Sequence, residues 1–213
     1  MKGADVANEA DPPTGDANSS VGATLLVRLR AGQAGAWERL VRLYGQTVYV
    51  WCRGAGVSEA DAADVSQEVF AAVARHIADF RRERPGDSFR GWLWTITRNK
   101  VRDHWRRHAD GVQAAGGTTA QQVMNQVPEE GLPDTGAWAE GEASELYRRA
   151  LELIRSEFEE RTWKAFLMVT VEGRLPADAA AALGTTPGAV YIAKSRVLKR
   201  LRDEFGDLIE GGE

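Results

Sequence analysis

Cysteine, histidine and long apolar runs are all scarce in this chain of 213 residues. Cys52 is the only cysteine, so the chain can form neither an internal disulfide nor a zinc site built from cysteines. It stands in an apolar segment, which is typical of a buried structural thiol and favours a cytoplasmic location. No apolar run approaches the roughly 20 residues of a membrane span. Residues 1–20 lack the basic start and apolar stretch of a signal peptide, and we expect a disordered leader there.

The alternation of apolar and polar residues that marks a β-strand is not sustained anywhere in the chain. Apolar residues instead recur at three- and four-residue steps, as in amphipathic helices. This pattern stops between 108 and 141, where small and polar residues dominate and the composition indicates a linker. We therefore predict an all-α protein made of two small helical domains joined by a flexible linker, with a helix-turn-helix in the second. The predicted parts are the leader at 1–20, a first domain at 21–107, the linker at 108–141 and a second domain at 142–209.

Residues that typically cap the start of a helix occur within both patterned units. The Ser58 hydroxyl can cap one helix, and Ser88 can cap another that runs from residue 89 to about 107. Thr186 can cap the last helix, with Pro187 at its first position, the site that proline prefers. Together with the apolar spacing, these caps predict four helices in the first unit and four in the second.

The net charge of −4 conceals a strong segregation of charge along the chain. Residues 81–107 contain nine Lys and Arg against three Asp and Glu, and residues 186–202 contain five basic residues and no acidic one. A polyanion would interact with those two segments and not with the mean charge. The pattern therefore allows a nucleic-acid partner despite the acidic total.

The strongest local pattern, at residues 178–202, predicts a helix-turn-helix. A short alanine-rich helix ends at Gly184, and a basic helix follows it after a brief turn. One side of the basic helix is apolar and suits a core; its residues are Ala189, Val190, Ala193, Val197 and Leu201. The other side suits a DNA major groove, with small and polar residues first and cations later; its residues are Gly188, Tyr191, Ile192, Ser195, Arg196, Lys199 and Arg202. A solvated basic helix near a C-terminus would show the same pattern.

Residues 172–202 resemble region 4 of the extracytoplasmic-function (ECF) sigma factors, in the run from Glu172-Gly173-Arg174-Leu175-Pro176 to Lys199-Arg200-Leu201-Arg202. In that family this region reads the upstream, minus-thirty-five promoter element. The family often has a basic residue where this chain has Tyr191 and a polar one at Ile192. The resemblance implies these minus-thirty-five contacts: Thr186, Gly188, Tyr191, Ser195, Arg196, Lys199 and Arg202.

The stretch from Asp61 to Phe70 resembles the segment of region 2 that docks on the clamp helices of the RNA polymerase largest subunit in that family. Its polar and acidic residues stand beside an apolar face and suit pairing with basic residues of a partner helix. A solvated helix face near an N-terminus would show the same acids. The implied docking residues, called the docking strip below, are Asp61, Asp64, Gln67 and Glu68.

Residues 89–107 resemble the family's segment that recognises and melts the minus-ten element. Melting needs cations for the backbone and aromatic or shaped pockets for extruded bases, and the segment interleaves the two. By the same resemblance the loop at 81–88 forms the rim of the base pocket. The aromatic residues also suit a hydrophobic core, above all Phe89, Trp92 and Trp105. The implied minus-ten contacts are Arg81, Arg82, Arg84, Arg90, Trp94, Arg98, Lys100, Arg102 and Arg106.

The two blocks, in the family's order, predict a sigma factor that binds core RNA polymerase and promoter DNA, has no catalytic residue or cofactor, and can be masked by an anti-sigma factor. One alternative is a helix-turn-helix regulator that never binds polymerase and dimerises on a palindromic site. Another is a metal-dependent enzyme that uses His104 and His108, four residues apart on a predicted helix. No third ligand stands near them in a recognisable motif, so we predict no metal site.

Overall fold

The computed structural model describes residues 24–84, 86–112 and 141–209, and all regular structure in these ranges is helical. The predicted leader and linker residues 113–140 lie outside the described residues. The all-α prediction is confirmed. The helices are α1 (Leu25–Arg30), α2 (Ala36–Gly54), α3 (Glu59–His76), α4 (Phe89–Val112), α6 (Glu142–Ile154), the 3-10 turn η1 (Arg155–Glu157), α7 (Glu160–Thr170), α8 (Pro176–Leu183) and α9 (Pro187–Ile209).

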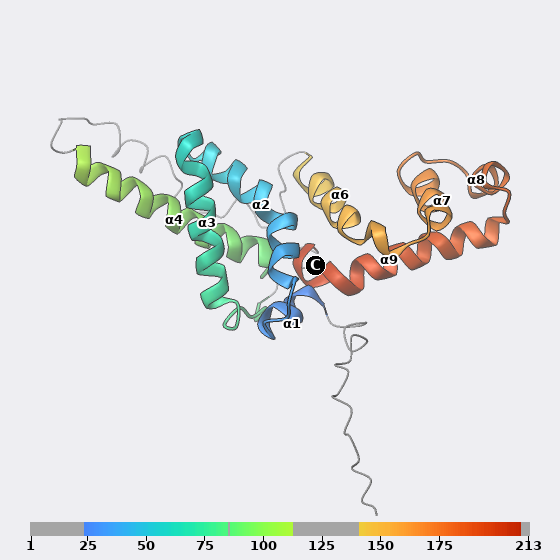
Figure 1. Ribbon diagram of the computed structural model, residues 1–213, viewed down its shortest axis with the longest axis horizontal. Coiled ribbons are helices and arrows are strands. Elements are labelled where there is room, and N and C mark those ends of the chain that lie inside the picture. The colour runs from blue at the N-terminus through green and yellow to red at the C-terminus, as the bar shows by residue number, and fades with distance from the viewer. Residues whose placement is uncertain (1–23, 85, 113–140, 210–213) are drawn as a thin grey trace, which may run out of the picture.

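Helices α1–α4 form one group and α6–α9 a second, and α9 extends from α8 back to α1 and α4 (Figure 1). We call these the N-terminal group and the C-terminal group. In the described part of the chain, no helix is long and apolar enough to cross a membrane. Helix α4 continues five residues beyond its predicted end at 107 and so takes up the first residues of the predicted linker.

The predicted helix caps are confirmed. The Ser58 Oγ accepts a hydrogen bond from the backbone N–H of Asp61 at 3.1 Å, and Ser88 Oγ accepts one from Gly91 at 3.1 Å. Thr186 Oγ1 accepts from the N–H of Ala189 at 3.2 Å. Each bond satisfies a backbone N–H group that has no partner inside the helix, because it lies in the first turn. Side chains a few positions earlier in the sequence therefore determine where these helices begin.

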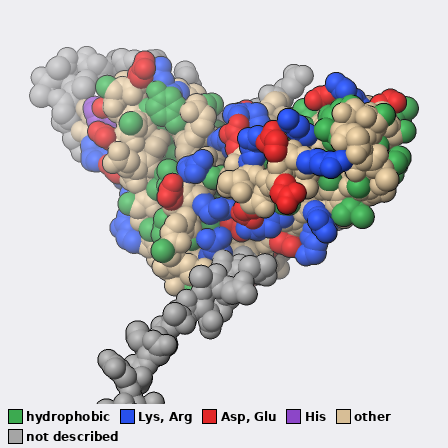
Figure 2. Space-filling model, turned by 45° about the vertical axis from the view of Figure 1, so that its right-hand side comes forward, with side chains coloured by type: hydrophobic (Ala, Val, Ile, Leu, Met, Phe, Trp, Pro, Cys, Tyr) green, Lys and Arg blue, Asp and Glu red, His purple; other side chains and the backbone are tan. Residues whose placement is uncertain are grey.

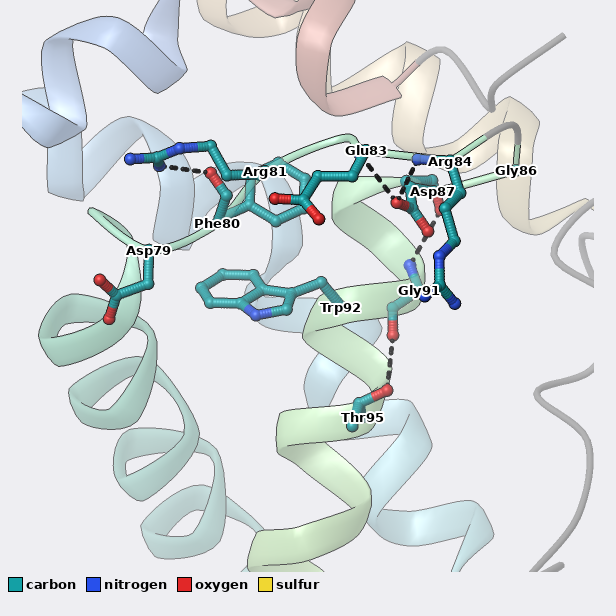
Figure 3. A pocket seen from close by; sticks show the side chains of 11 residues that line it. Asp79, Phe80, Arg81, Glu83, Arg84, Gly86, Asp87, Gly91, Trp92 and Thr95 are labelled. Carbon is teal, nitrogen blue, oxygen red and sulfur yellow. Dashed lines mark hydrogen bonds between the residues drawn. The ribbon is translucent and has the colours of Figure 1, made fainter.

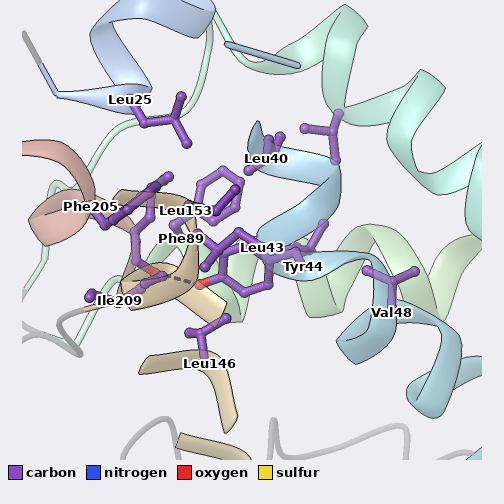
Figure 4. Packing of buried hydrophobic residues seen from close by; sticks show 14 of the residues in the cluster. Leu25, Leu40, Leu43, Tyr44, Val48, Phe89, Leu146, Leu153, Phe205 and Ile209 are labelled. Atoms are coloured by element: carbon purple, nitrogen blue, oxygen red, sulfur yellow. Dashed lines mark hydrogen bonds between the residues drawn. The ribbon is translucent and has the colours of Figure 1, made fainter. Parts of the chain in front are cut away.

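A single buried core joins the two groups. Side chains from α1, α2, α4, α6 and α9 converge in it, including the fully buried Tyr44, Phe89, Leu146 and Phe205 (Figure 4). The Tyr44 hydroxyl donates a hydrogen bond to the carbonyl of Leu208 near the end of α9. The division into domains at 21–107 and 142–209 stays a prediction. What the structure adds is that helices from both ranges pack together.

A second, smaller core lies between α7, α8 and α9; α8 and α9 are the segment predicted to form a helix-turn-helix, and we keep that name for it. Ala165 of α7, Ala179 and Ala180 of α8, and Val190 and Ala193 of α9 are buried against one another. Gly184 ends α8 with φ +59°, the left-handed conformation that glycine adopts without strain. The predicted inner face of α9 is buried at Val190, Ala193, Val197 and Leu201, whereas Ala189 in the first turn is exposed.

Candidate nucleic-acid interface

The loop between α3 and α4 covers a pocket of about 460 Å³, which we call the loop pocket. Its lining includes six residues of the stretch 81–88 together with Trp92 and Thr95 of α4 (Figure 3). The Asp87 carboxylate accepts hydrogen bonds from the backbone N–H groups of Glu83 at 3.0 Å and Arg84 at 2.8 Å, and so holds the loop in its turn. The pocket lies where the resemblance placed a base-binding rim.

An aromatic cluster forms one side of the loop pocket. The rings of Phe80 and Phe89 are buried, and Trp92 packs on them with centroid distances of 5.1 and 5.6 Å. Trp92 is half-buried and lines the pocket, so part of its ring faces the cavity. Trp94, the tryptophan predicted to contact DNA, packs edge-on against Trp51 at 5.2 Å and does not line the pocket. The sequence pattern had placed Trp94 among the DNA contacts and Trp92 among the core candidates, whereas Trp92 is the one that lines the pocket.

Cations surround the loop pocket and continue along α4. Arg81, Arg82 and Arg84 are exposed on the loop. The predicted contacts Arg98, Lys100 and Arg102 are half-buried on α4, and Arg106 is exposed. Lys100 and Arg106 flank Asp103, at 3.8 and 3.4 Å, and this pairing holds them on one side of the helix.

Arg90 does not fit its predicted role in this arrangement. Its guanidinium Nη2 lies 2.7 Å from a carboxylate oxygen of Glu142 at the start of α6, and it stacks over the ring of Trp51 at 5.3 Å. Both members of the ion pair are nearly buried, with side-chain exposures of 10% and 16%. Arg90 therefore joins the two groups. Its side chain does not face solvent, whereas a side chain that contacts DNA must be exposed.

Helix α9 presents all of its predicted DNA-reading residues to solvent. Tyr191 and Ile192 are 60% and 55% exposed. Arg196 forms no ion pair or hydrogen bond with the described residues, whereas Lys199 pairs with Asp203 at 2.6 Å. Thr186 occupies the cap position, and the exposed set is completed by Gly188, Ser195 and Arg202.

Opposite charges are intermingled on the face of the molecule in Figure 2, where blue and red side chains alternate over much of the surface. On this face the positive charge is therefore local and does not form one continuous patch. Such a surface favours contacts at defined positions over general attraction of a polyanion.

The docking strip lies along α3. Asp64 and Gln67 are exposed, and Glu68 accepts two hydrogen bonds from Arg107 of α4, at 2.9 and 3.1 Å. The Ser58 hydroxyl donates to the Asp61 carboxylate at 2.6 Å and lowers the pKa of that carboxyl. A second pocket, of about 430 Å³, is lined both by residues of this strip and by His104, Arg107 and His108 of α4.

Glu204 is the structurally important residue that the sequence analysis missed. Its carboxylate is 1% exposed and lies 2.8 Å from Arg28, 2.9 Å from Arg39 and 2.8 Å from Arg200. Three arginines thus compensate one buried carboxylate, and two of them belong to the N-terminal group. The available signal was its position, because Glu204 follows Val197 and Leu201 on the apolar stripe of α9.

Other polar contacts join the groups beside the Glu204 cluster. Arg149 of α6 donates to the carbonyl of Leu43 at 2.7 Å and to the hydroxyl of Thr47 at 3.1 Å. Arg82 of the loop donates to the carbonyl of Asp207 in α9. The interface is therefore apolar at its centre and rich in arginine at its edge.

Comparison with known proteins identifies both the N-terminal segment and the chain as a whole. Residues 40–110 match the family Sigma-70 region 2. Over 94 residues the chain is 36% identical to the ECF RNA polymerase sigma factor BldN of Streptomyces coelicolor, a match that covers 44% of this chain and 35% of BldN. It is 35% identical over 82 residues to the sigma factor CnrH of Cupriavidus metallidurans, and the match covers 38% of this chain and 41% of CnrH. The chain thus spans well under half the length of these two relatives.

A third relative is matched over most of its length. The ECF RNA polymerase sigma factor SigD of Mycobacterium tuberculosis is 30% identical over 180 residues, covering 82% of this chain and 79% of SigD. A chain in the solved RsbN–BldN complex is 23% identical, with a TM-score of 0.34, and the match covers 83% of this chain and 96% of that one. The length and identity of the match to SigD establish the family: this chain belongs to the ECF RNA polymerase sigma factors.

Proposed function

We propose that this protein binds core RNA polymerase and directs it to particular promoters. The observation that carries this proposal is the loop pocket: a cavity over a half-buried tryptophan, with arginines around it, inside the stretch that matches Sigma-70 region 2. A cavity of this size, lined by an aromatic ring and polar groups, suits a base extruded from a duplex. The protein's part in initiation is then binding and positioning, without covalent chemistry.

The second element of the proposal is the exposed face of α9. Gly188 lies in the first turn of α9 and Ser195 in its third, and small side chains allow close approach to base edges. Arg196 and Lys199 follow and suit contacts with phosphates. The docking strip on α3 completes the set, as the surface that would meet the polymerase. An anti-sigma factor that masks these surfaces remains an expectation of the family.

Use of all the predicted minus-ten contacts requires the two groups to part. Arg82 and Arg90, both predicted to contact DNA, are engaged by residues of the C-terminal group in this arrangement. Those contacts must break before the two arginines can reach a nucleic acid. We infer that the arrangement described here is the free form of the protein, and that polymerase and promoter compete with the interface between the groups.

The decisive experiment mixes the untagged chain with purified bacterial core polymerase and then transcribes fragmented genomic DNA. We expect a stable complex and new, defined start sites whose alignment supplies the promoter motif. Asp64→Ala should weaken the complex without altering the fold, and Glu152→Ala, an exposed carboxylate on α6, is the matched control. Failure of the inhibitor-free chain to bind polymerase would contradict the proposal and favour a regulator that acts on a palindromic site.

The loop pocket is tested by a pair of neighbouring tryptophans. Trp92→Leu removes the ring that lines the pocket, and Trp94→Leu removes one that does not. Stacking of a base on an aromatic ring contributes about 1–3 kcal/mol, so Trp92→Leu should reduce promoter melting by about tenfold. Permanganate reactivity of unpaired thymines measures the melting. Equal losses in both variants would show that the pocket does not hold a base.

A further inference from the structure

The second pocket contains a cluster of possible metal ligands that the sequence did not bring together. Asp61 of α3 lies next to His104 and His108 of α4, and one ligand atom from each lies within 4.8 Å of the other two. The carboxylate oxygen of Asp61 is 4.0 Å from Nε2 of His104. The sequence showed only the two histidines, four residues apart on one helix. The fold supplies the carboxylate from another helix 43 positions earlier in the chain.

The rings of the two histidines lie side by side, and a hydrogen bond to the backbone orients the ring of His108. His104 is buried, and the rings of His104 and His108 lie 4.1 Å apart between centroids. The Nδ1 atom of His108 is 2.9 Å from the carbonyl oxygen of His104. A carbonyl can only accept a hydrogen bond, so Nδ1 carries the proton and the lone pair is left on Nε2. This support from a backbone carbonyl is the usual one for a histidine that binds a metal.

The charges around the pocket also suit a cation. Asp64 and Glu68 line the same cavity, and the exposed carboxylate of Asp64 can offer a further oxygen ligand. Arg107 lines it as well, but its guanidinium is engaged by the Glu68 carboxylate at 2.9 and 3.1 Å. The Ser58 hydroxyl donates to Oδ2 of Asp61 at 2.6 Å, the same oxygen that lies 4.0 Å from His104, and so fixes the position of that oxygen.

We propose that Asp61, His104 and His108 form a binding site for a divalent transition metal of the zinc class. Two imidazoles and one carboxylate are a set that zinc accepts, whereas magnesium and calcium prefer oxygen ligands alone. Zinc bonds of about 2.0–2.2 Å place tetrahedral ligands roughly 3.4 Å apart, so ligand atoms that lie within 4.8 Å of one another must close by up to about 1.4 Å. His108 is exposed near the end of α4 and can make that adjustment.

A bound cation would link the first turn of α3 to the last turns of α4. It would also reduce the negative charge of the docking strip, to which Asp61 belongs; this consequence rests on the proposed function. The binding of the metal does not depend on that function, because the site is built entirely from residues of this chain.

The test measures zinc binding by the full, untagged chain, using competition with a chromophoric chelator. We expect one zinc ion per chain, bound at micromolar or lower free zinc. His108→Ala should weaken binding by at least about tenfold, because it removes one ligand. His76→Ala is the matched control: His76 is the only other histidine of the chain, it is exposed at the end of α3, and it lies outside the cluster.

A stability measurement provides the second readout. Zinc that binds the native state alone should raise the melting temperature of the unaltered chain and of His76→Ala, but not that of His108→Ala. Because His108 is exposed, its replacement should leave the fold intact, which circular dichroism can verify. Equal zinc binding by His108→Ala and His76→Ala would overturn the proposal, and so would the absence of binding at micromolar zinc.

Discussion

The two cores of this protein differ in the size of the side chains that form them. The shared core between the groups contains Tyr44, Phe89 and Phe205 together with many leucines. The core of the helix-turn-helix contains mainly alanine, at Ala165, Ala179, Ala180 and Ala193. Large side chains bury more apolar area and contribute more to the free energy of folding. Alanines contribute less but allow helix backbones to approach closely.

We expect the large core to determine the stability of the protein and the alanine core to determine the position of α9. The large core stabilises the contact of α2 and α4 with α6 and α9, so we expect the two groups to unfold together in the free protein. In the helix-turn-helix the alanines fix how closely α8 lies against α7 and α9, and therefore how α9 is presented. The following predictions test these expectations.

Phe89→Ala should give the largest loss of stability. Its ring is fully buried against Tyr44 and Phe80, at centroid distances of 5.4 and 5.6 Å. Removal of a buried phenylalanine costs about 3–5 kcal/mol, because it leaves a cavity as well as losing contacts. Urea unfolding followed by circular dichroism measures the loss. Phe89→Leu should lose less, and unfolding of α1–α4 alone would contradict a shared core.

Glu204→Ala should cost about 3 kcal/mol, because it leaves arginines in the interface without the carboxylate that compensates them. Those arginines retain side-chain exposures of 12–31%, so water screens part of the effect. Hydrogen exchange should show faster opening of α1 and the end of α9. Glu152→Ala, which removes an exposed carboxylate paired on the surface of α6, should be nearly neutral. Equal effects of the two would show that Glu204 does not hold the groups together.

Ala179→Leu should affect DNA binding more than stability. Overpacking a tight core costs about 1–3 kcal/mol, and here it must push α8 away from α7 or α9. We expect weaker binding to the upstream promoter element even at temperatures where the chain is folded. Ala181→Leu, at an exposed position of the same helix, is the control. Unchanged affinity in Ala179→Leu would mean that the alanine core does not set the geometry of α9.

Arg196→Ala should have the smallest effect on stability, because the side chain is exposed and makes no ion pair with the described residues. Its effect should appear in the salt dependence of binding to the upstream element. Each lost phosphate contact lowers the slope of log K against log salt by about one unit. Arg148→Ala, an exposed arginine of α6, should leave the slope unchanged. An unaltered slope in Arg196→Ala would remove this residue from the DNA contacts.

The helices could be predicted because their signals are local. The hydroxyls of Ser58, Ser88 and Thr186 cap helices within three residues of their own positions, so no distant contact is needed to place them. The apolar stripe of α9 was predicted for the same reason. The choice between Trp92 and Trp94 could not be made locally, because which ring lines the loop pocket depends on where Phe80 and Trp51 lie.

The sequence by itself determined that the chain is all-α and where its capped helices begin. It also determined the positions of the two basic segments and of the residues that resemble the ECF sigma factors. It did so because helix periodicity, capping and motifs depend on residues a few positions apart. Only the tertiary structure decided that Arg90 pairs with Glu142, that Glu204 joins the groups, and that Asp61 meets His104 and His108. These contacts join residues far apart in the chain, and they follow from the packing of helices around a common core.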